Sequence, residues 1–201
     1  MPRSVQTLVD LFAEMPGIGP RHARRVVQFL LRSAPSYRVE LIRGIETLLK
    51  TVRQCSACFR YDDVNEKNLC HLCNDASREN NQLLVVEKDV DVEGVEASHA
   101  YRGYYFVLGG LMPLATQRKT SVALRTNELM NRVRKTPALG EVILAFATTP
   151  EGDFTSRELR TAIEKEFPNV RVSELGRGLS LGAEIEYADH ETLRSALNAR
   201  R

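Results

Sequence analysis

The 201-residue chain has no cysteine outside one stretch of 19 residues, and it has no long hydrophobic run. Its longest apolar run, near residues 142–147, is far shorter than the roughly 20 residues that a membrane helix needs. No N-terminal stretch combines a basic flank, an apolar core and a small-residue cleavage site. These absences exclude a membrane-spanning protein and argue against a secreted one. We therefore expect a soluble, cytoplasmic protein with no membrane partner.

Net charge is also small, at +2, but it is unevenly distributed. Residues 1–60 contain ten Lys or Arg and four Asp or Glu, whereas residues 61–201 contain 18 Lys or Arg and 22 Asp or Glu. A polyanionic partner therefore fits the N-terminal end, and a merely solvated charged surface is the alternative. The length suits one sizeable domain with one or two small modules.

The four cysteines form two Cys-x-x-Cys pairs, Cys55 with Cys58 and Cys70 with Cys73, separated by 11 residues. Each pair can supply two corners of a tetrahedron, so the spacing predicts one structural zinc ion per chain. Two disulfides, or one redox-active pair, are the alternatives, but they suit a secreted mini-protein or a single motif beside a βαβ unit. His71 could replace one thiolate, although a surface position fits it better.

Residues 15–25 combine a Gly-x-Gly turn, a proline suited to the first position of a helix, and a series of arginines. Gly17 and Gly19 allow the backbone to approach a bound group, and free N–H groups at a helix N-terminus bind phosphate without reading base identity. On a helical wheel the polar residues share an arc of about 100°: Arg21, Arg24, Arg25, Gln28 and Arg32. Ala23, Val26, Val27 and Leu30 face the opposite side. A plain structural turn is the alternative.

From residue 81 the pattern changes to short apolar runs that alternate with helical segments. We expect strands at residues 83–87, 104–108, 142–146 and 170–173, and helices at 92–100, 123–135 and 155–167. This alternation predicts an α/β fold with a mostly parallel sheet and flanking helices. Gly109 and Gly110 lack the flanking pattern of a phosphate-binding loop and indicate a turn.

Acidic residues follow two of these strands. Glu87 ends the first strand, and Glu151 and Asp153 follow the strand at 142–146. Because sites in open α/β sheets lie at the carboxyl ends of the strands, the three side chains could converge and hold Mg²⁺. The alternative is that they are ordinary carboxylates at strand and helix ends.

Two of these segments resemble known modules. Residues 15–25 resemble the helix-hairpin-helix motif of DNA repair proteins, and residues 81–175 resemble a Toprim domain. In that comparison Glu87 matches the Toprim glutamate, and Glu151-Gly152-Asp153 stands where the domain usually has two aspartates separated by one residue. The Glu at position 151 is thus a departure. In catalytic Toprim enzymes such a cluster acts on phosphodiester bonds.

The order of these modules resembles the RecR family of bacterial recombination mediators over nearly the full length. Further landmarks lie at residues 84–87 with Asp91, 101–110 with Pro113, 141–145, 177–179, Gly182 and 186–189. The resemblance implies a helix-hairpin-helix region (1–53), a zinc finger (54–80), a Toprim domain (81–175) and a C-terminal tail that contributes to subunit contact (176–201). Residues 184–187 of this tail alternate like an extended arm or an edge strand.

The resemblance also implies a function. Members of the family are non-enzymatic DNA clamps of the bacterial cytoplasm and nucleoid, and they form dimers and ring-like tetramers. Their partners RecO and RecF direct them to gapped or single-stranded DNA, so that RecA displaces single-strand-binding protein. The resemblance further implies DNA binding by Gly17, Gly19, Arg21, Arg24 and Arg25. It also implies a surface for partner proteins at Glu87, Asp91, Glu151 and Asp153.

Two other functions compete with the clamp. A metal-dependent nuclease or a topoisomerase-like enzyme would use Glu87, Glu151 and Asp153 on phosphodiester bonds. A zinc adaptor that binds only protein would be insensitive to loss of Arg21 and Arg25.

Overall fold

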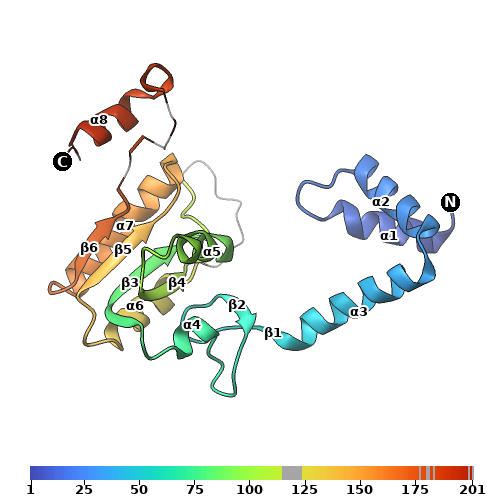
Figure 1. Ribbon diagram of the computed structural model, residues 1–201, viewed down its shortest axis with the longest axis horizontal. Helices are drawn as coiled ribbons and strands as arrows, with labels where there is room; N and C mark the ends of the chain where they lie inside the picture. Colours follow the sequence, from blue (N-terminus) through green and yellow to red (C-terminus); the bar gives the residue numbers. More distant parts are fainter. Residues whose placement is uncertain (115–123, 177, 180–181, 183, 199, 201) are drawn as a thin grey trace. The chain divides into compact units, whose positions relative to one another are not determined.

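A computed structural model of the protein describes residues 1–114, 124–176, 178–179, 182, 184–198 and 200 (Figure 1). The chain forms two compact units, Met1–Val52 and Arg53–Arg201. Two of the positions considered above, Ala123 and Arg177, lie outside the described residues.

The first unit consists of three helices, α1 (Arg3–Ala13), α2 (Pro20–Arg32) and α3 (Pro35–Thr51). Pro20 and Pro35 both stand at the start of a helix, where the missing N–H costs no hydrogen bond. Helices α1 and α2 enclose a small core of Val9, Ala23 and Val27. The apolar side of α2 predicted from the sequence is thereby confirmed at Ala23 and Val27. Helix α3 has no buried residue.

The cysteine region begins the second unit. Strands β1 (Val52–Gln54) and β2 (Tyr61–Asp63) pair as a two-stranded sheet, and the one-turn helix α4 (His71–Asn74) follows. These elements are short. The loops between them carry Cys55, Cys58 and Cys70, and Cys73 lies in α4.

A four-stranded sheet forms the centre of the second unit. Its strands are β3 (Glu79–Val86), β4 (Gly103–Val107), β5 (Glu141–Ala145) and β6 (Arg171–Glu174), and their order is β4-β3-β5-β6. All three pairings are parallel, as predicted. The strands alternate with α5 (Asp89–Ser98), α6 (Thr126–Arg134) and α7 (Pro150–Glu166). From β3 the chain continues to β4 on one side of the sheet, and from β5 it continues to β6 on the other side. The carboxyl ends of the neighbouring strands β3 and β5 therefore form the topological switch point.

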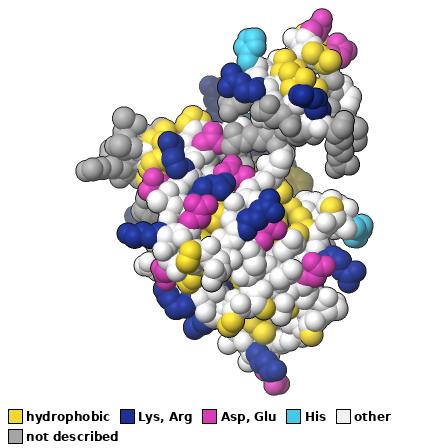
Figure 2. Space-filling view, turned by 90° about the vertical axis from the view of Figure 1, so that its left-hand side faces the viewer, with side chains coloured by type: hydrophobic (Ala, Val, Ile, Leu, Met, Phe, Trp, Pro, Cys, Tyr) yellow, Lys and Arg dark blue, Asp and Glu magenta, His cyan; other side chains and the backbone are white. Residues whose placement is uncertain are grey.

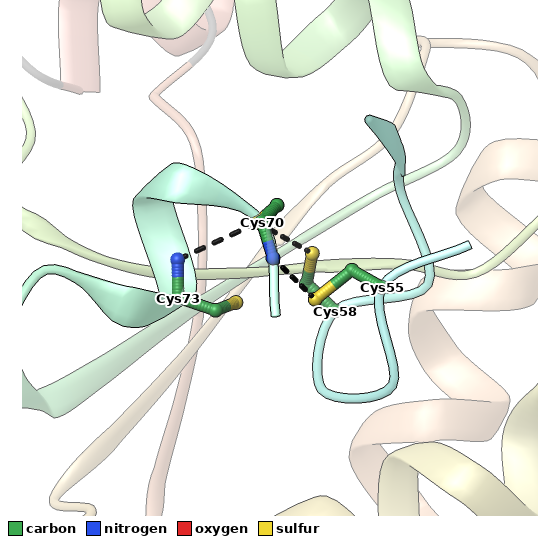
Figure 3. Close-up of side chains that lie close together, drawn as sticks. All are labelled: Cys55, Cys58, Cys70 and Cys73. Atoms are coloured by element: carbon green, nitrogen blue, oxygen red, sulfur yellow. Dashed lines mark hydrogen bonds between the residues drawn. The ribbon is translucent and has the colours of Figure 1, made fainter. Parts of the chain in front are cut away.

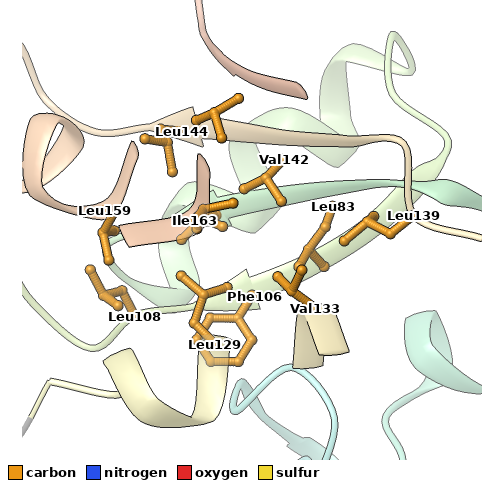
Figure 4. Packing of buried hydrophobic residues seen from close by; sticks show 12 residues of the cluster. Leu83, Phe106, Leu108, Leu129, Val133, Leu139, Val142, Leu144, Leu159 and Ile163 are labelled. Atoms are coloured by element: carbon orange, nitrogen blue, oxygen red, sulfur yellow. The ribbon is translucent and has the colours of Figure 1, made fainter. Parts of the chain in front are cut away.

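Two hydrophobic clusters cover the two faces of the sheet, which is why β3 is apolar at four consecutive positions. On one face Leu129 and Val133 of α6 and Leu159 and Ile163 of α7 pack against the strands (Figure 4). On the other face Val92 of α5 packs together with the cysteine region. The cysteine module therefore takes the place of a second helix on that face.

Two predictions about local structure are corrected. Helix α7 begins at Pro150, five residues before the predicted start, because the Thr149 side chain accepts a hydrogen bond from the N–H of Gly152 and caps the helix. In the tail, Ile185–Tyr187 forms a 3₁₀ turn and not a strand. Its i→i+3 hydrogen bonds run from Tyr187 N–H to Glu184 O and from Ala188 N–H to Ile185 O. Helix α8 (His190–Asn198) follows.

None of the helices in the described ranges combines the length and the apolar character that crossing a membrane requires.

Gly152 fixes how the first turn of α7 meets the end of β5. A Cβ atom at this position would lie 2.0 Å from the backbone oxygen of Ala147, which cannot move away easily. We expect Gly152→Ala to destabilise the second unit by about 1–3 kcal/mol, as overpacking does. The matched control is Gly94→Ala in α5, where a Cβ meets nothing within 4 Å. This control should be neutral or stabilising by up to about 1 kcal/mol. Thermal unfolding measures both, and equal melting temperatures for the two variants would contradict the steric account.

Candidate metal centre and nucleic-acid interface

The four cysteine side chains converge on one point in the second unit (Figure 3). Their sulfur atoms all lie within 4.8 Å of one another, and the Cys58 and Cys70 Sγ atoms are 3.7 Å apart. All four belong to the described residues and are free thiols, so the structure does not contain the alternative pair of disulfides. Cys55, Cys58 and Cys70 are buried, and Cys73 is half-buried.

Backbone turns of the two loops place the sulfur atoms. After the first pair, Phe59 takes a left-handed conformation (φ 63°), and the N–H of Cys55 donates to the carbonyl of Arg60. Before the second pair, Asn68 is also left-handed (φ 57°), and its carbonyl accepts from the N–H of Ser56. The loops are therefore hydrogen-bonded to each other. Cys70 then caps α4, because its sulfur accepts from the N–H of Cys73.

This geometry fits a tetrahedral metal ion. Zinc–sulfur bonds of about 2.3 Å imply sulfur–sulfur edges of about 3.8 Å, which agrees with the 3.7 Å between Cys58 and Cys70. The N–H of Cys70 donates to the sulfur of Cys55, a contact that favours a thiolate. His71 is not part of the group: its side chain is 65% exposed and contacts Asp62 at 2.9 Å. The expected surface position of His71 is thus what the structure shows.

The thiols also perturb one another. A hydrogen bond between the two side chains lowers the pKa of Cys55 and raises the pKa of Cys58. Cys55 raises the pKa of Cys70, whereas Cys58 and Cys73 lower it, and the result is a value of about 7. Four thiolates this close together cannot coexist without a cation, so the cluster is suited to exchange its protons for a metal ion.

The cysteine module is docked on β4, the edge strand of the sheet. The N–H of Val107 donates to the carbonyl of Cys58 at 2.8 Å. Next to this bond the Phe59 ring packs against Phe106, with ring centroids 5.4 Å apart, and the Arg125 guanidinium lies over the Phe59 ring. An otherwise unpaired strand edge is thereby covered.

Polar contacts tie the same module to α5. The N–H of Tyr61 donates to the carboxylate of Asp89 at 2.7 Å. Arg78, which precedes β3, pairs with Glu96, and the Tyr105 hydroxyl donates to the same carboxylate. Burial opposes the charge of Glu96, but the hydrogen bonds from Arg78 and Tyr105 outweigh it, so the pKa of Glu96 is lowered. The carboxylate therefore stays ionised and keeps both partners at neutral pH.

In the first unit, the turn between α1 and α2 has an open glycine surface. Gly17 is left-handed (φ 78°), and Gly19 is the extended N-cap of α2. A Cβ at either position would meet nothing within 4 Å, so the space above the turn is free for a ligand. The N–H of Ile18 donates to the carbonyl of Met15, which closes the turn. These features allow backbone N–H groups of the turn to contact a phosphate group.

The predicted arginine surface lies on α2 directly after this turn. Arg21, Arg24 and Arg25 are all exposed, and none forms an ion pair with any described residue. Together with Gln28 and Arg32 they occupy the side of α2 opposite Ala23 and Val27. A shallow groove of about 400 Å³ on this side is lined by Arg24, Arg25, Gln28, Phe29 and Arg32. Phe29 was missed from the sequence, although it lies between Arg25 and Arg32 at helical spacing.

The predicted acidic residues stand near the carboxyl ends of β3 and β5, but their roles differ. Glu87 lies 3.5 Å from the ammonium of Lys88, and Asp91 accepts from the N–H of Lys88 as part of the α5 cap. Glu151 and Asp153 lie in the first turn of α7, where the helix dipole favours negative charge. Asp153 also lines a cavity of about 510 Å³ together with Glu174 and Asp189.

The structure does not bring these carboxylates together as a cation site. Within the described ranges, the cysteines are the only group of three or more side chains placed to hold a metal. The magnesium site therefore stays a prediction. The face drawn in Figure 2 likewise carries acidic and basic side chains intermixed, without one continuous acidic surface.

Comparison with known proteins agrees with this architecture. Residues 81–175 match the model of the Toprim domain, and residues 178–201 match the model described as "RecR, C-terminal". The chain is 37% identical over 197 residues to "Recombination protein RecR" of Dehalococcoides mccartyi, covering 98% of this chain and 93% of that protein. A protein of the same name from Chloroflexus aggregans is 39% identical, and the match covers 98% of this chain and 93% of that protein. Another, from Cereibacter sphaeroides, is 34% identical, and the match covers 100% of this chain and 97% of that protein. With identities above 30% over nearly the whole of each protein, the chain belongs to the RecR family of recombination proteins.

Proposed function

We propose that this protein is a non-catalytic DNA clamp of recombinational repair, which acts with RecO, and with RecF, to load RecA on gapped or single-stranded DNA coated by single-strand-binding protein. The exposed, unpaired arginine side of α2, placed after an open Gly-x-Gly turn, carries the proposal. Arg21, Arg24 and Arg25 neutralise phosphates, and the backbone at Gly17 and Gly19 lies close to the sugar-phosphate chain. Neither contact reads bases, so no sequence preference is expected.

A clamp needs more than one subunit, and the first unit offers an apolar surface for assembly. Helix α3 has no buried residue, and an apolar groove of about 350 Å³ runs along it. Its lining is mostly aliphatic and includes Leu8, Leu30, Leu31, Leu41, Ile42 and Ile45. Apolar groups on this scale favour burial against a partner. Assembly as a dimer or tetramer multiplies weak phosphate contacts, because each bound subunit raises the effective concentration of the next.

The metal in the cysteine cluster is proposed to be zinc, held by Cys55, Cys58, Cys70 and Cys73 in a structural role. Four thiolates close the coordination sphere, so no open position remains for a substrate or a water nucleophile. The carboxylates Glu87, Asp91, Glu151 and Asp153 are proposed to act as a docking surface for RecO. Their separation argues against the alternative nuclease or topoisomerase-like enzyme, which would need them on a shared metal.

Cys58→Ser tests the metal centre. We expect zinc content to fall from about one ion per chain to near zero, because three thiolates leave the site open and the buried fourth corner uncharged. Protease cleavage between residues 55 and 73 should become fast. His71→Ala is the matched control, since it changes the neighbouring sequence but no ligand. Zinc retained at full stoichiometry in Cys58→Ser, with unchanged proteolysis, would refute the assignment.

Changing Arg21 and Arg25 together to alanine tests the DNA contact. The variant should bind all DNA sequences more weakly, and the slope of log affinity against log salt should decrease by roughly two, one for each lost phosphate contact. Arg3 and Arg43 are exposed arginines on α1 and α3, so their double alanine variant removes the same charge elsewhere in the same unit. Fluorescence anisotropy across a salt series measures both. Equal slopes in the two variants would contradict a phosphate contact at Arg21 and Arg25.

RecA loading tests the whole proposal. On DNA coated by single-strand-binding protein, loading should require this protein and RecO together, and the Arg21/Arg25 variant should fail where the Arg3/Arg43 variant works. DNA should stay intact in Mg²⁺ or Mn²⁺. Metal-dependent cleavage that Glu87→Gln abolishes would instead establish the enzyme. A protein-only adaptor would load RecA without Arg21 and Arg25.

A further inference from the structure

Two exposed aromatic rings lie beside the arginines of α2. The Phe29 ring and the Tyr37 ring, at the start of α3, meet edge to face with centroids 5.6 Å apart and planes at 79°. Phe29 is 56% exposed and Tyr37 is 44% exposed. A phenylalanine this open gives little to the stability of the fold, because much of its apolar area stays in water.

Phe29 is separate from both apolar regions of the first unit. It is not a member of the core cluster of Val9, Ala23 and Val27 or of the partly buried residues packed around it. Nor does it line the apolar groove along α3, where a second subunit is proposed to pack. The ring is instead part of the groove whose other lining residues are Arg24, Arg25, Gln28 and Arg32.

The chemistry of that groove matches a nucleic-acid strand with unpaired bases. Its lining contains three arginines and no acidic residue, so it attracts phosphates. A flat aromatic ring among such cations stacks on a base of any identity. In a duplex the base faces are already stacked on one another and cannot reach the ring, whereas in a single strand they can.

We propose that Phe29 is a base-stacking residue that gives the arginine surface of α2 a preference for single-stranded over double-stranded DNA. The inference rests on the proposed DNA-binding function of the same surface. Arg24, Arg25 and Arg32 hold the phosphates on either side, and Tyr37 supports the Phe29 ring from its edge-to-face position. Phosphate contacts alone would bind single-stranded and double-stranded DNA alike. Stacking of a base on the Phe29 ring favours the single-stranded form.

The first test compares substitutions at Phe29 in the full-length chain. Phe29→Leu keeps an apolar side chain but removes the aromatic face, and Phe29→Trp enlarges that face. We expect Phe29→Leu to weaken binding of oligothymidylate about tenfold, whereas duplex DNA and an abasic oligonucleotide of equal length change by less than about twofold. Phe29→Trp should bind oligothymidylate at least as tightly as the unchanged protein. Equal losses on all three ligands would overturn the proposal.

The second test uses the absence of tryptophan from the natural sequence. Phe29→Trp introduces a single tryptophan, whose fluorescence is quenched when a base stacks on the indole. We expect quenching on saturation with oligothymidylate and none with the abasic oligonucleotide. Equal fluorescence with both ligands at saturation would overturn the stacking contact even if binding is retained.

Two controls separate the possible failures. If the unchanged protein, alone and with RecO, binds no DNA, the proposed function itself fails. If it binds DNA that needs Arg21 and Arg25 but is indifferent to Phe29, only the stacking inference fails. Light scattering of Phe29→Leu checks the assembly state, and a changed subunit number would mean that Phe29 belongs to a subunit interface, which also overturns the proposal.

Discussion

The second unit depends on the clustering of four cysteine sulfurs, three of them from buried residues, next to the parallel sheet. The loops have little regular structure of their own, and the sulfur cluster, once it holds a metal, replaces the core that so short a segment cannot build. The hydrogen bond from Val107 to Cys58 and the packing of Phe59 on Phe106 join this cluster to β4. The sulfur cluster and the sheet therefore form one folding unit, and the cysteine module covers an edge that would otherwise be open to pairing with another strand.

The first unit follows a different principle, because most of what it offers is directed outward. Its core is only a few residues, α3 buries none, and the arginines of α2 have no acidic partner within the described part of the chain. Such a unit is suited to the proposed binding of a second subunit on the aliphatic groove and of nucleic acid on the cationic one. The two grooves are lined by different residues, so assembly and DNA binding need not compete.

The sequence predicted the features that local pattern controls. Cysteine spacing predicted one cluster of four thiols, and the structure brings these thiols together. The short apolar runs at residues 83–86 and 142–145 predicted strands, and both segments lie in strands of the parallel sheet. Three features were missed. The N-cap at Thr149 extends α7 back to Pro150 and places Glu151 and Asp153 on a helix. The alternation at residues 184–187 fitted an extended arm or an edge strand, but the segment pairs with no strand in the described part of the chain and forms a 3₁₀ turn. Phe29 was passed over because helical periodicity does not distinguish an exposed aromatic residue from a core one.

Hydrogen exchange with and without metal tests the central claim most directly. The protein as purified, with its zinc content measured by native mass spectrometry, is compared with protein treated with a chelator. If the sulfur cluster and the sheet edge form one unit, residues 55–73 and β4 should lose protection together when the metal is removed, while α1 and α2 stay unchanged. Protein that contains no metal, or loss of protection in residues 55–73 with β4 unaffected, would contradict the account.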